Sequence, residues 1–530
     1  MTRTSNQNAI SKSDKVQPEG MSILDITCIG IIECEQDHEW HESISETKID
    51  NEDLITLPTL NAKETVEDVG ISSELDPEQS KQVKRLLQNH REVMTDAPGR
   101  TNLAYHEIKT TSTEPIRSKP YPLPYALHET VNREIDDMLR LGIIERSDSP
   151  YASPIVLVKK RDGSNRFCVD FRKLNKITVF DAEPIPSQEE IFARLANDHY
   201  FTKFDLSKGY WQIPVEPNAR DKTAFLSPSG LYHFRMMPFG LVNAPATFSR
   251  MMRSLLKGLG HVDNYIDDIL VHTVSWETHM KVLSELLCKL KDANLTAKPS
   301  KCVVGMHKVE FLGHIVGQGQ LAPQPDKMLK IQNAPVPQTK KQLRSFLGLS
   351  GYYRKFIPNY ATLAAPLTSK TKSKEPNSID FDETERQAFD TLKACLDSHP
   401  ILHLADCNRP FILRTDASDV GIGAVLLQEK NGEVFPVVYA SRKLLDRERA
   451  YSIMEKECLA LVWAINKFQC YLYGKPFVLE TDHQPLVYMQ KTKVANPRIM
   501  RWALSLQPYQ FRIEAIKGSD NVGADYLSRM

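Results

Sequence analysis

Two adjacent aspartates, Asp267 and Asp268, lie between two short runs of strand-favouring residues at positions 262–264 and 269–271. Because β-branched and apolar residues prefer sheet and Asp tolerates turns, the pattern predicts a hairpin with both carboxylates at its tip. Adjacent ionised carboxylates repel and raise one another's pKa unless a cation lies between them. The pair therefore favours a site for a divalent metal ion.

A third carboxylate, Asp205, follows the apolar run at 200–204 and can reach the pair from a neighbouring strand. Mg²⁺ prefers hard oxygen ligands such as carboxylates and substrate phosphates. Two ions a few Å apart form the clamp for in-line phosphoryl transfer. We expect two Mg²⁺ ions in this site, with Mn²⁺ as a substitute; an isolated acidic pair would also suit a solvated hairpin, so the other motifs decide.

Four motifs occur in order: FDLSKGYWQIPV at 204–215, MPFGLVNAPATF at 237–248, YIDD at 265–268 and FLGH at 311–314. Together they resemble the reverse transcriptase of gypsy-like LTR retrotransposons, part of a Pol polyprotein, over about residues 85–530. The resemblance implies an α+β and α/β multidomain chain: a right-hand polymerase with fingers, palm and thumb, followed by an RNase H-like α/β domain. It also implies that Asp205, Asp267 and Asp268 are catalytic metal ligands.

The resemblance extends to the nucleotide-binding residues. It places Arg166 on the arginine that grips the incoming triphosphate, with Lys159 or Lys160 as its partner, and leaves open which lysine. Such cations neutralise phosphate charge in the transition state. We expect Asp170 and Arg172 to brace this hairpin with an ion pair instead.

Three further segments take roles from the resemblance. Tyr210 would occupy the space of a ribose 2′-OH and so select deoxynucleotides, the alternative being a core tyrosine. Phe239 and Gly240 would lie in a loop close to the nucleotide and template. The primer grip would consist of Phe311, Leu312, Gly313 and His314.

Other segments predict helices and domain boundaries. We expect helices over 76–94 with Asp76 as cap, over 128–141 and over 276–292, and a basic helical thumb over 339–356 whose tyrosines accompany a duplex. The expected domains are an acidic, weakly ordered N-terminal tether (1–75), an N-terminal arm and start of fingers (76–150), fingers and palm (151–318), thumb and linker (319–380) and RNase H-like domain (381–530).

A second acidic set follows position 410. Two predicted strands end near Asp416 and Asp482, a predicted helix carries Glu457, and Asp525 lies in the last segment. This order resembles RNase H, which implies four catalytic metal ligands and again two Mg²⁺ ions that cleave the RNA strand of a hybrid. Glu455 is the rival for the helix position. The histidine that retroviral RNases H carry before the last acid is absent from 515–520.

Composition adds a charge asymmetry. Residues 1–80 hold 5 Lys/Arg against 18 Asp/Glu, while the remaining residues hold 62 against 49, so a net charge of −13 precedes a net charge of +13. The excess of basic residues after position 80 suits phosphate binding. No apolar run of about 18 residues and no apolar signal core occur, so we expect an intracellular protein without a membrane span, either cytoplasmic (in a virus-like particle) or nuclear.

The expected function is an RNA-directed DNA polymerase, also active on DNA templates, with a fused RNase H, for retrotransposon replication. Its partners would be an RNA template, a DNA primer, the RNA–DNA hybrid and dNTPs, with a homodimer left open. Two alternatives stay open: a pararetrovirus-type polymerase, and a domesticated inactive remnant that binds nucleic acid. Since no Asp-Thr/Ser-Gly triplet occurs and the chain ends five residues after Asp525, we expect neither protease nor integrase.

Overall fold

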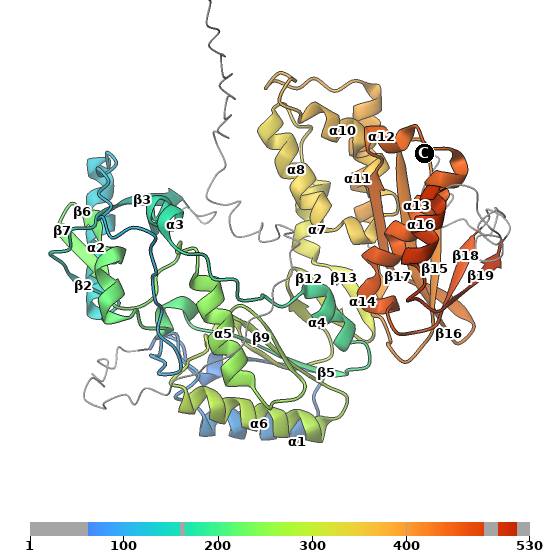
Figure 1. The fold of residues 1–530 in the computed structure, drawn as a ribbon. Helices are drawn as coiled ribbons and strands as arrows, with labels where there is room; N and C mark the ends of the chain where they lie inside the picture. Colours follow the sequence, from blue (N-terminus) through green and yellow to red (C-terminus); the bar gives the residue numbers. More distant parts are fainter. Residues whose placement is uncertain (1–61, 160–164, 399, 482–496, 517–530) are drawn as a thin grey trace, which may run out of the picture. The chain divides into compact units, whose positions relative to one another are not determined.

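The computed structural model describes residues 62–159, 165–398, 400–481 and 497–516. Within these residues the strands form four sheets, each with its own helices (Figure 1). None of the helices in the described ranges combines the length and the apolar character that crossing a membrane requires.

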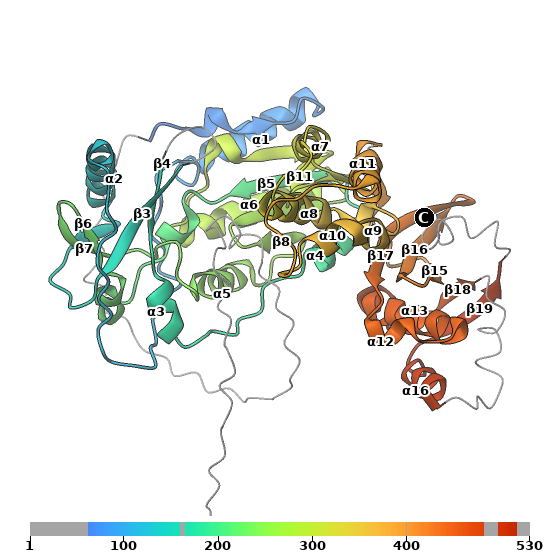
Figure 2. The same cartoon turned by 90° about the horizontal axis from the view of Figure 1, so that it is seen from above.

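The palm sheet has the strand order β1-β10-β5-β9-β8. Its strands are β1 (Gly70–Ile71), β5 (Tyr200–Asp205), β8 (Val262–Tyr265), β9 (Asp268–Thr273) and β10 (Val303–Met306). The helices around it are α1 (Pro77–Asn89), α4 (Gln188–Arg194), α5 (Ala244–Leu256) and α6 (Trp276–Asp292). Helix α1 lies beside α6, where Trp276 Nε1 donates to Gln82 at 2.9 Å (Figure 2).

The fingers sheet has the order β2-β7-β6-β3-β4. Its strands are β2 (Ile144–Arg146), β3 (Ser153–Lys159), β4 (Asn165–Val169), β6 (Phe225–Ser227) and β7 (Gly230–Phe234). Its helices are α2 (His128–Arg140) and α3 (Arg172–Ile177).

The third sheet has the order β11-β12-β13-β14. Its strands are β11 (Val309–Phe311), β12 (His314–Gly317), β13 (Gln320–Pro323) and β14 (Leu402–His403). The accompanying helices are α7 (Pro325–Gln332), α8 (Lys340–Tyr352), α9 (Tyr360–Leu363), α10 (Ala365–Lys370) and α11 (Glu383–Asp397).

The fourth sheet has the order β17-β16-β15-β18-β19. Its strands are β15 (Phe411–Ala417), β16 (Gly421–Lys430), β17 (Glu433–Lys443), β18 (Phe477–Thr481) and β19 (Phe511–Ala515). Its helices are α12 (Asp446–Arg449), α13 (Ile453–Lys467), α14 (Gln469–Leu472) and α16 (Pro497–Ser505).

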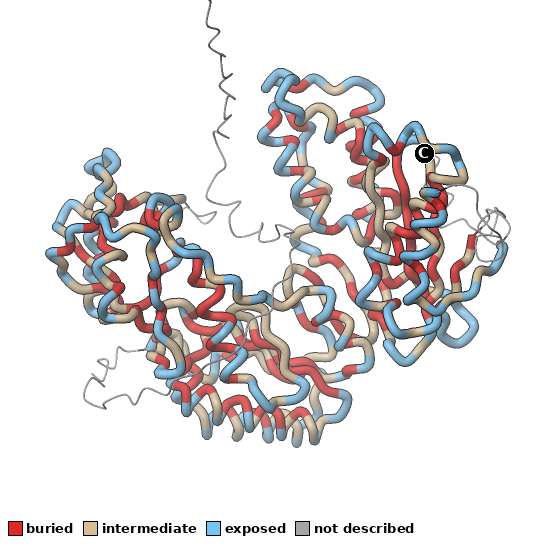
Figure 3. The backbone as a smooth tube through the Cα atoms, in the orientation of Figure 1, coloured by how far each residue is buried: buried red, intermediate tan, exposed pale blue. Residues whose placement is uncertain are grey.

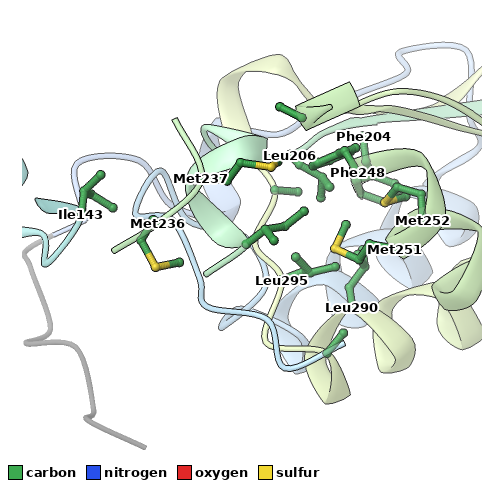
Figure 4. Packing of buried hydrophobic residues seen from close by; sticks show 14 of the residues in the cluster. Ile143, Phe204, Leu206, Met236, Met237, Phe248, Met251, Met252, Leu290 and Leu295 are labelled. Carbon is green, nitrogen blue, oxygen red and sulfur yellow. The ribbon is translucent and has the colours of Figure 1, made fainter. Parts of the chain in front are cut away.

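The two faces of the palm sheet contribute to different cores. Alternate residues of a strand point to opposite faces, and Phe204 and Ile269 pack in one cluster with α5 and α6, whereas Phe201 and Leu270 pack in another with α4, α8 and the third sheet. Figure 4 shows Phe204 beside Phe248 of α5, and Figure 3 shows buried residues concentrated along the strands and the inner helix faces. Both faces of the central strands are therefore fixed by packing.

The predicted helices are confirmed, although α1 ends at Asn89, five residues before the predicted end at Met94. Helix α6 begins and ends where its apolar spacing predicts, and Asp76 caps α1 by accepting from Gln79 N at 2.7 Å. The thumb segment is helical, but α8 ends at Tyr352 and a separate 3-10 turn follows at Arg354–Phe356.

Two expectations about loosely held segments differ from the structure. At the end of the predicted tether, β1 pairs in parallel with β10, so Gly70 and Ile71 form an edge strand of the palm sheet. Residues 368–380, at the end of the predicted thumb and linker (319–380), pack against α8, where buried Lys340 donates to the backbone carbonyls of Lys372 and Glu375. Both segments are held by hydrogen bonds to their backbone groups, which a local polar composition does not reveal.

Candidate active site

Three aspartates meet at one end of the palm sheet. Asp205 is the last residue of β5 and Asp268 the first of β9, and the two are direct partners in the antiparallel ladder. Asp267 occupies the turn before β9, where Ile266 has a φ of 55°. The predicted hairpin is confirmed, with one change: Asp268 lies in the strand and only Asp267 in the turn.

Two lysines contact these carboxylates. Lys203 Nζ lies 3.1 Å from Asp268 Oδ1, and Lys301 Nζ lies 2.9 and 3.1 Å from the two oxygens of Asp205. Lys203 precedes Asp205 by two residues in β5 and shares its face, so the strand pattern could have indicated it. Lys301 belongs to a 3-10 turn, Pro299–Lys301, far away in sequence, and no local pattern indicates its partner.

The electrostatics fit the carboxylate set to a divalent cation. Burial, followed by the charges of Asp268 and Asp205, raises the pKa of Asp267 to about 6. Burial also raises the pKa of Asp268, although Lys203 opposes the shift. Buried carboxylates this close together repel one another. A bound Mg²⁺ ion, whose preferred ligands are hard oxygens, would offset this repulsion. These three residues are the ones that would hold the metal.

Three aromatic side chains, Tyr210, Phe239 and Phe248, form an aromatic wall beside Asp267. The ring of Tyr210 lies 5.0 Å from that of Phe239 and 5.4 Å from that of Phe248. Burial and the charge of Asp267 raise the pKa of the Tyr210 phenol. A Cβ on Gly209 would lie 3.2 Å from the Phe248 ring and 3.3 Å from Asp267 Cβ, so a larger residue would require these neighbours to shift. The structure thus brings Tyr210 and Phe239 next to the predicted catalytic turn.

The loop after Phe239 has a conformation that requires glycine. Gly240 has a φ of 93°, and its carbonyl accepts from Asn175 Nδ2 at 2.8 Å. Asp170 forms the predicted ion pair with Arg172 at 2.7 Å, and hydrogen bonding from Arg172 lowers the pKa of Asp170 to about 2. Asp170 is therefore engaged in bracing the fingers.

The predicted triphosphate ligands are only partly described. Arg166 lies in β4 opposite Val158, and Lys159 lies in β3 opposite Asn165. The side chains of Lys159 and Arg166, and the whole of Lys160, fall outside the described residues. Their roles stay predictions.

The predicted primer grip forms the hairpin of β11 and β12: Phe311 pairs with His314, and Leu312 and Gly313 form the loop. The structure corrects the interpretation of one of the two thumb tyrosines, Tyr353. Tyr353 is fully buried, and its hydroxyl donates to Gly313 O at 2.7 Å, so it packs inside the protein instead of facing a duplex.

The second acidic site is partly described. Asp416 lies near the end of β15 and Glu457 lies in α13, which packs on that strand; both side chains are buried. Glu455 has a different surrounding: it caps α13 by accepting from Ser452 N at 3.0 Å and pairs with Arg498 at 2.9 Å. Asp482 and Asp525 lie outside the described residues, so the assignment of all four acids remains a prediction.

One further group has potential metal-ligand atoms close together: Asp198, His261 and His272. His272 Nδ1 lies 2.7 Å from Asp198 Oδ2, and Nε2 lies 3.1 Å from Asp263 Oδ2. Burial lowers the pKa of His272, but the hydrogen bonds to both aspartates outweigh it and leave the pKa raised. When its ring is protonated, His272 can donate from both nitrogens, to Asp198 and to Asp263.

Comparison with known proteins identifies both regions. Residues 158–316 match the family model of the reverse transcriptase (RNA-dependent DNA polymerase), and residues 406–509 match that of the RNase H-like domain found in reverse transcriptase. The chain therefore carries a reverse transcriptase domain followed by an RNase H-like domain.

More specifically, the chain resembles the Pol polyproteins of gypsy-type retrotransposons. It is 43% identical to the Pol polyprotein of Drosophila melanogaster transposon 297 over 438 residues, which cover 81% of this chain and 41% of that protein. Identity to the polyprotein of D. melanogaster transposon gypsy is 37%, over 80% of this chain and 42% of that protein. The chain thus spans less than half the length of these relatives.

Solved structures share the fold. A foamy viral protease–reverse transcriptase in complex with double-stranded DNA aligns with a TM-score of 0.74 at 25% identity, over 84% of this chain and 95% of that one. A second structure of this kind aligns with a TM-score of 0.77 at 24% identity, over 85% and 80% of the two chains. The predicted architecture, a polymerase followed by an RNase H-like domain, is confirmed.

Proposed function

We propose that this chain is an RNA-directed DNA polymerase, also able to copy DNA, whose fused RNase H degrades RNA in RNA–DNA hybrids during retrotransposon replication. The observation that carries the proposal is the direct pairing of Asp205 with Asp268 beside the turn that holds Asp267. Two strands and one turn deliver three carboxylates to one point, next to an aromatic wall that can border a sugar.

In this proposal Asp205, Asp267 and Asp268 hold two Mg²⁺ ions, or Mn²⁺ in their place. When bound, the metal would neutralise phosphate charge during in-line phosphoryl transfer. The chain's own residues orient the substrates: the Tyr210 ring limits the space beside the sugar, and Phe239 flanks that ring at 5.0 Å. Arg166, with Lys159 or Lys160, would bind the triphosphate of the dNTP.

The substrates follow from the same proposal: an RNA or DNA template, a DNA primer and the resulting hybrid. The primer 3′ end would lie against the Leu312–Gly313 turn. For RNA cleavage, Asp416, Glu457, Asp482 and Asp525 would hold a second pair of ions.

The test is Mg²⁺-dependent incorporation of dTTP on poly(rA)/oligo(dT), with Asp267→Asn and Glu457→Gln as reciprocal controls. We expect Asp267→Asn to abolish incorporation but keep cleavage of the hybrid, and Glu457→Gln to do the reverse. Each variant shows that the other domain is folded. Absence of incorporation by the wild-type chain, with hybrid binding retained, would favour the inactive nucleic-acid-binding remnant.

A further inference from the structure

The loop of the β11–β12 hairpin has an unfavourable residue at its first position. Phe311 and His314 pair directly, so the loop has two residues, Leu312 and Gly313, with φ values of 48° and 69°. Two positive φ values define a type I′ turn, which favours Asn-Gly. A leucine is sterically disfavoured there. Leu312 therefore depends on contacts from outside the loop to keep this conformation.

Three side chains supply such contacts, and all of them donate to the two loop carbonyls. His314 Nδ1 and the Tyr352 hydroxyl each lie 2.7 Å from Leu312 O. The Tyr353 hydroxyl lies 2.7 Å from Gly313 O. We call His314, Tyr352 and Tyr353 the carbonyl clamp. Both loop peptides are thereby held by side chains that lie outside the loop.

The environment of His314 fixes it as a neutral donor. Its ring is buried and lies 5.2 Å from the Phe192 ring and 5.7 Å from the Phe356 ring. Burial, together with the charge of Lys355, lowers the pKa of His314 to about 3. Nε2 has no hydrogen-bond partner among the described residues. A neutral ring with one donor commits that donor to Leu312 O.

The two tyrosines attach the loop to a different element. Tyr352 is the last residue of α8 and Tyr353 is its C-terminal cap. Helix α8 itself is anchored by Leu343 and Phe346, which belong to the same buried cluster as Phe201 of the palm sheet. A Cβ on Gly313 would lie 3.4 Å from Tyr352, which shows how closely the loop and the helix end approach.

We infer that Tyr352 and Tyr353 are positioning residues for polymerisation, because they fix the Leu312–Gly313 turn to the end of α8. The inference rests on the proposed function, in which this turn presses the primer 3′ end toward the catalytic carboxylates. The hydrogen bonds of the carbonyl clamp hold the turn against the end of α8. The placement of the primer terminus then depends on the two hydroxyl groups that donate to the carbonyls of the turn.

The test is the double variant Tyr352→Phe/Tyr353→Phe, which removes both hydroxyls and keeps both rings. Single-turnover dTTP incorporation on poly(rA)/oligo(dT) separates the maximal rate from the binding of dTTP and hybrid. We expect the maximal rate to fall by at least about tenfold, because small misplacements of reacting groups cost large factors. The dissociation constants of dTTP and hybrid should stay within about twofold, since no binding group is removed.

Two comparisons separate positioning from loss of structure. Tyr360→Phe is the matched control, because the Tyr360 hydroxyl contacts Ser350 and Leu347 of α8 but not the turn; it should leave the rate unchanged. The second comparison adds Leu312→Asn to the double variant, because asparagine adopts positive φ more readily than leucine. The maximal rate of this triple variant should lie within about threefold of the rate of Leu312→Asn alone.

The outcomes are distinguishable. An unchanged maximal rate in the double variant overturns the inference, and so does an equal loss in Tyr360→Phe or a failure of Leu312→Asn to restore the rate. Unchanged dissociation constants of dTTP and hybrid report that the polymerase region is folded, and retained hybrid cleavage reports the same for the RNase H-like domain. Absence of incorporation by the wild-type chain is a failure of the proposed function instead.

Discussion

Asp205 and Asp268 lie directly opposite one another in β5 and β9, and each has its own lysine: Lys301 contacts Asp205, and Lys203 contacts Asp268. With Asp267 beside them, three carboxylates meet two ammonium groups. The apo site therefore retains an excess of negative charge, which a divalent cation would neutralise.

Removal of the Lys203 ammonium group should lower the stability of the protein more in the absence of metal than in the presence of Mg²⁺. We expect Lys203→Met to lower the free energy of unfolding by about 2 kcal/mol in EDTA, since it removes a charged hydrogen bond, and by less in excess Mg²⁺, where the cation replaces the lysine charge. Urea denaturation in both buffers measures this. The control is Lys370→Met, which breaks an ion pair with Glu385 away from the site and should lower the stability equally in EDTA and in Mg²⁺. If Lys203→Met also lowers the stability equally in the two buffers, the prediction is contradicted.

Sugar selection should depend on the ring of Tyr210 and not on its hydroxyl. We expect Tyr210→Ala to raise the incorporation of rUTP relative to dTTP by at least about tenfold, because the space beside the sugar opens. Tyr210→Phe should keep the wild-type ratio. The ratio of kcat/KM values for the two nucleotides is the measurement. Equal ratios in Tyr210→Ala and the wild-type chain would assign Tyr210 to the core alone.

Glu455 and Glu457, the two glutamates of α13, should have different functions. Glu457→Gln should abolish hybrid cleavage with little change in stability. Glu455→Gln should retain cleavage but lose about 1 kcal/mol of stability, because Glu455 caps the helix and pairs with Arg498. Cleavage of a labelled RNA–DNA hybrid and thermal unfolding of both variants measure this. The reverse pattern would make Glu455 the catalytic acid.

The charge network around His272 should make stability depend on pH. Its folded pKa is raised above the ordinary 6.5, so its stabilisation is fully present below about pH 6.5 and is lost as the pH rises through the folded value. We expect His272→Gln to cost about 3 kcal/mol at the acidic end, where it breaks a buried ion pair, and less at alkaline pH. Urea denaturation of wild type and variant from about pH 6 to alkaline pH gives the difference.

The matched control for His272 is His279, which is also buried but whose pKa burial lowers to about 4. It is neutral throughout the neutral to alkaline range, so the cost of His279→Gln should not change with pH there. A pH-independent cost for His272→Gln would mean that its ring is neutral in the folded protein.

Local patterns predicted the elements that depend on nearby residues. The leucine spacing of α6 and the strand–turn–strand pattern around Asp267 both report on neighbours in sequence, and both are confirmed. These features need only the periods of helix and strand.

Features that depend on distant partners could not be predicted in this way. Lys301 reaches Asp205 across 96 positions, and Tyr353 donates to Gly313 across 40. A tyrosine beside basic residues looks the same in sequence whether it faces a duplex or a buried carbonyl. Only the topology, which places the end of α8 against the β11–β12 hairpin, distinguishes the two.

The ladder of β5, β9 and β8 also restricts how this gene can change. Asp205 pairs with Asp268, and Asp268 pairs with Tyr265. An added or deleted codon between Tyr265 and Asp268 would shift the register by one residue and move every side chain of a strand to the opposite face. A change in the length of this hairpin should therefore disturb the fold more than an exchange of residues does.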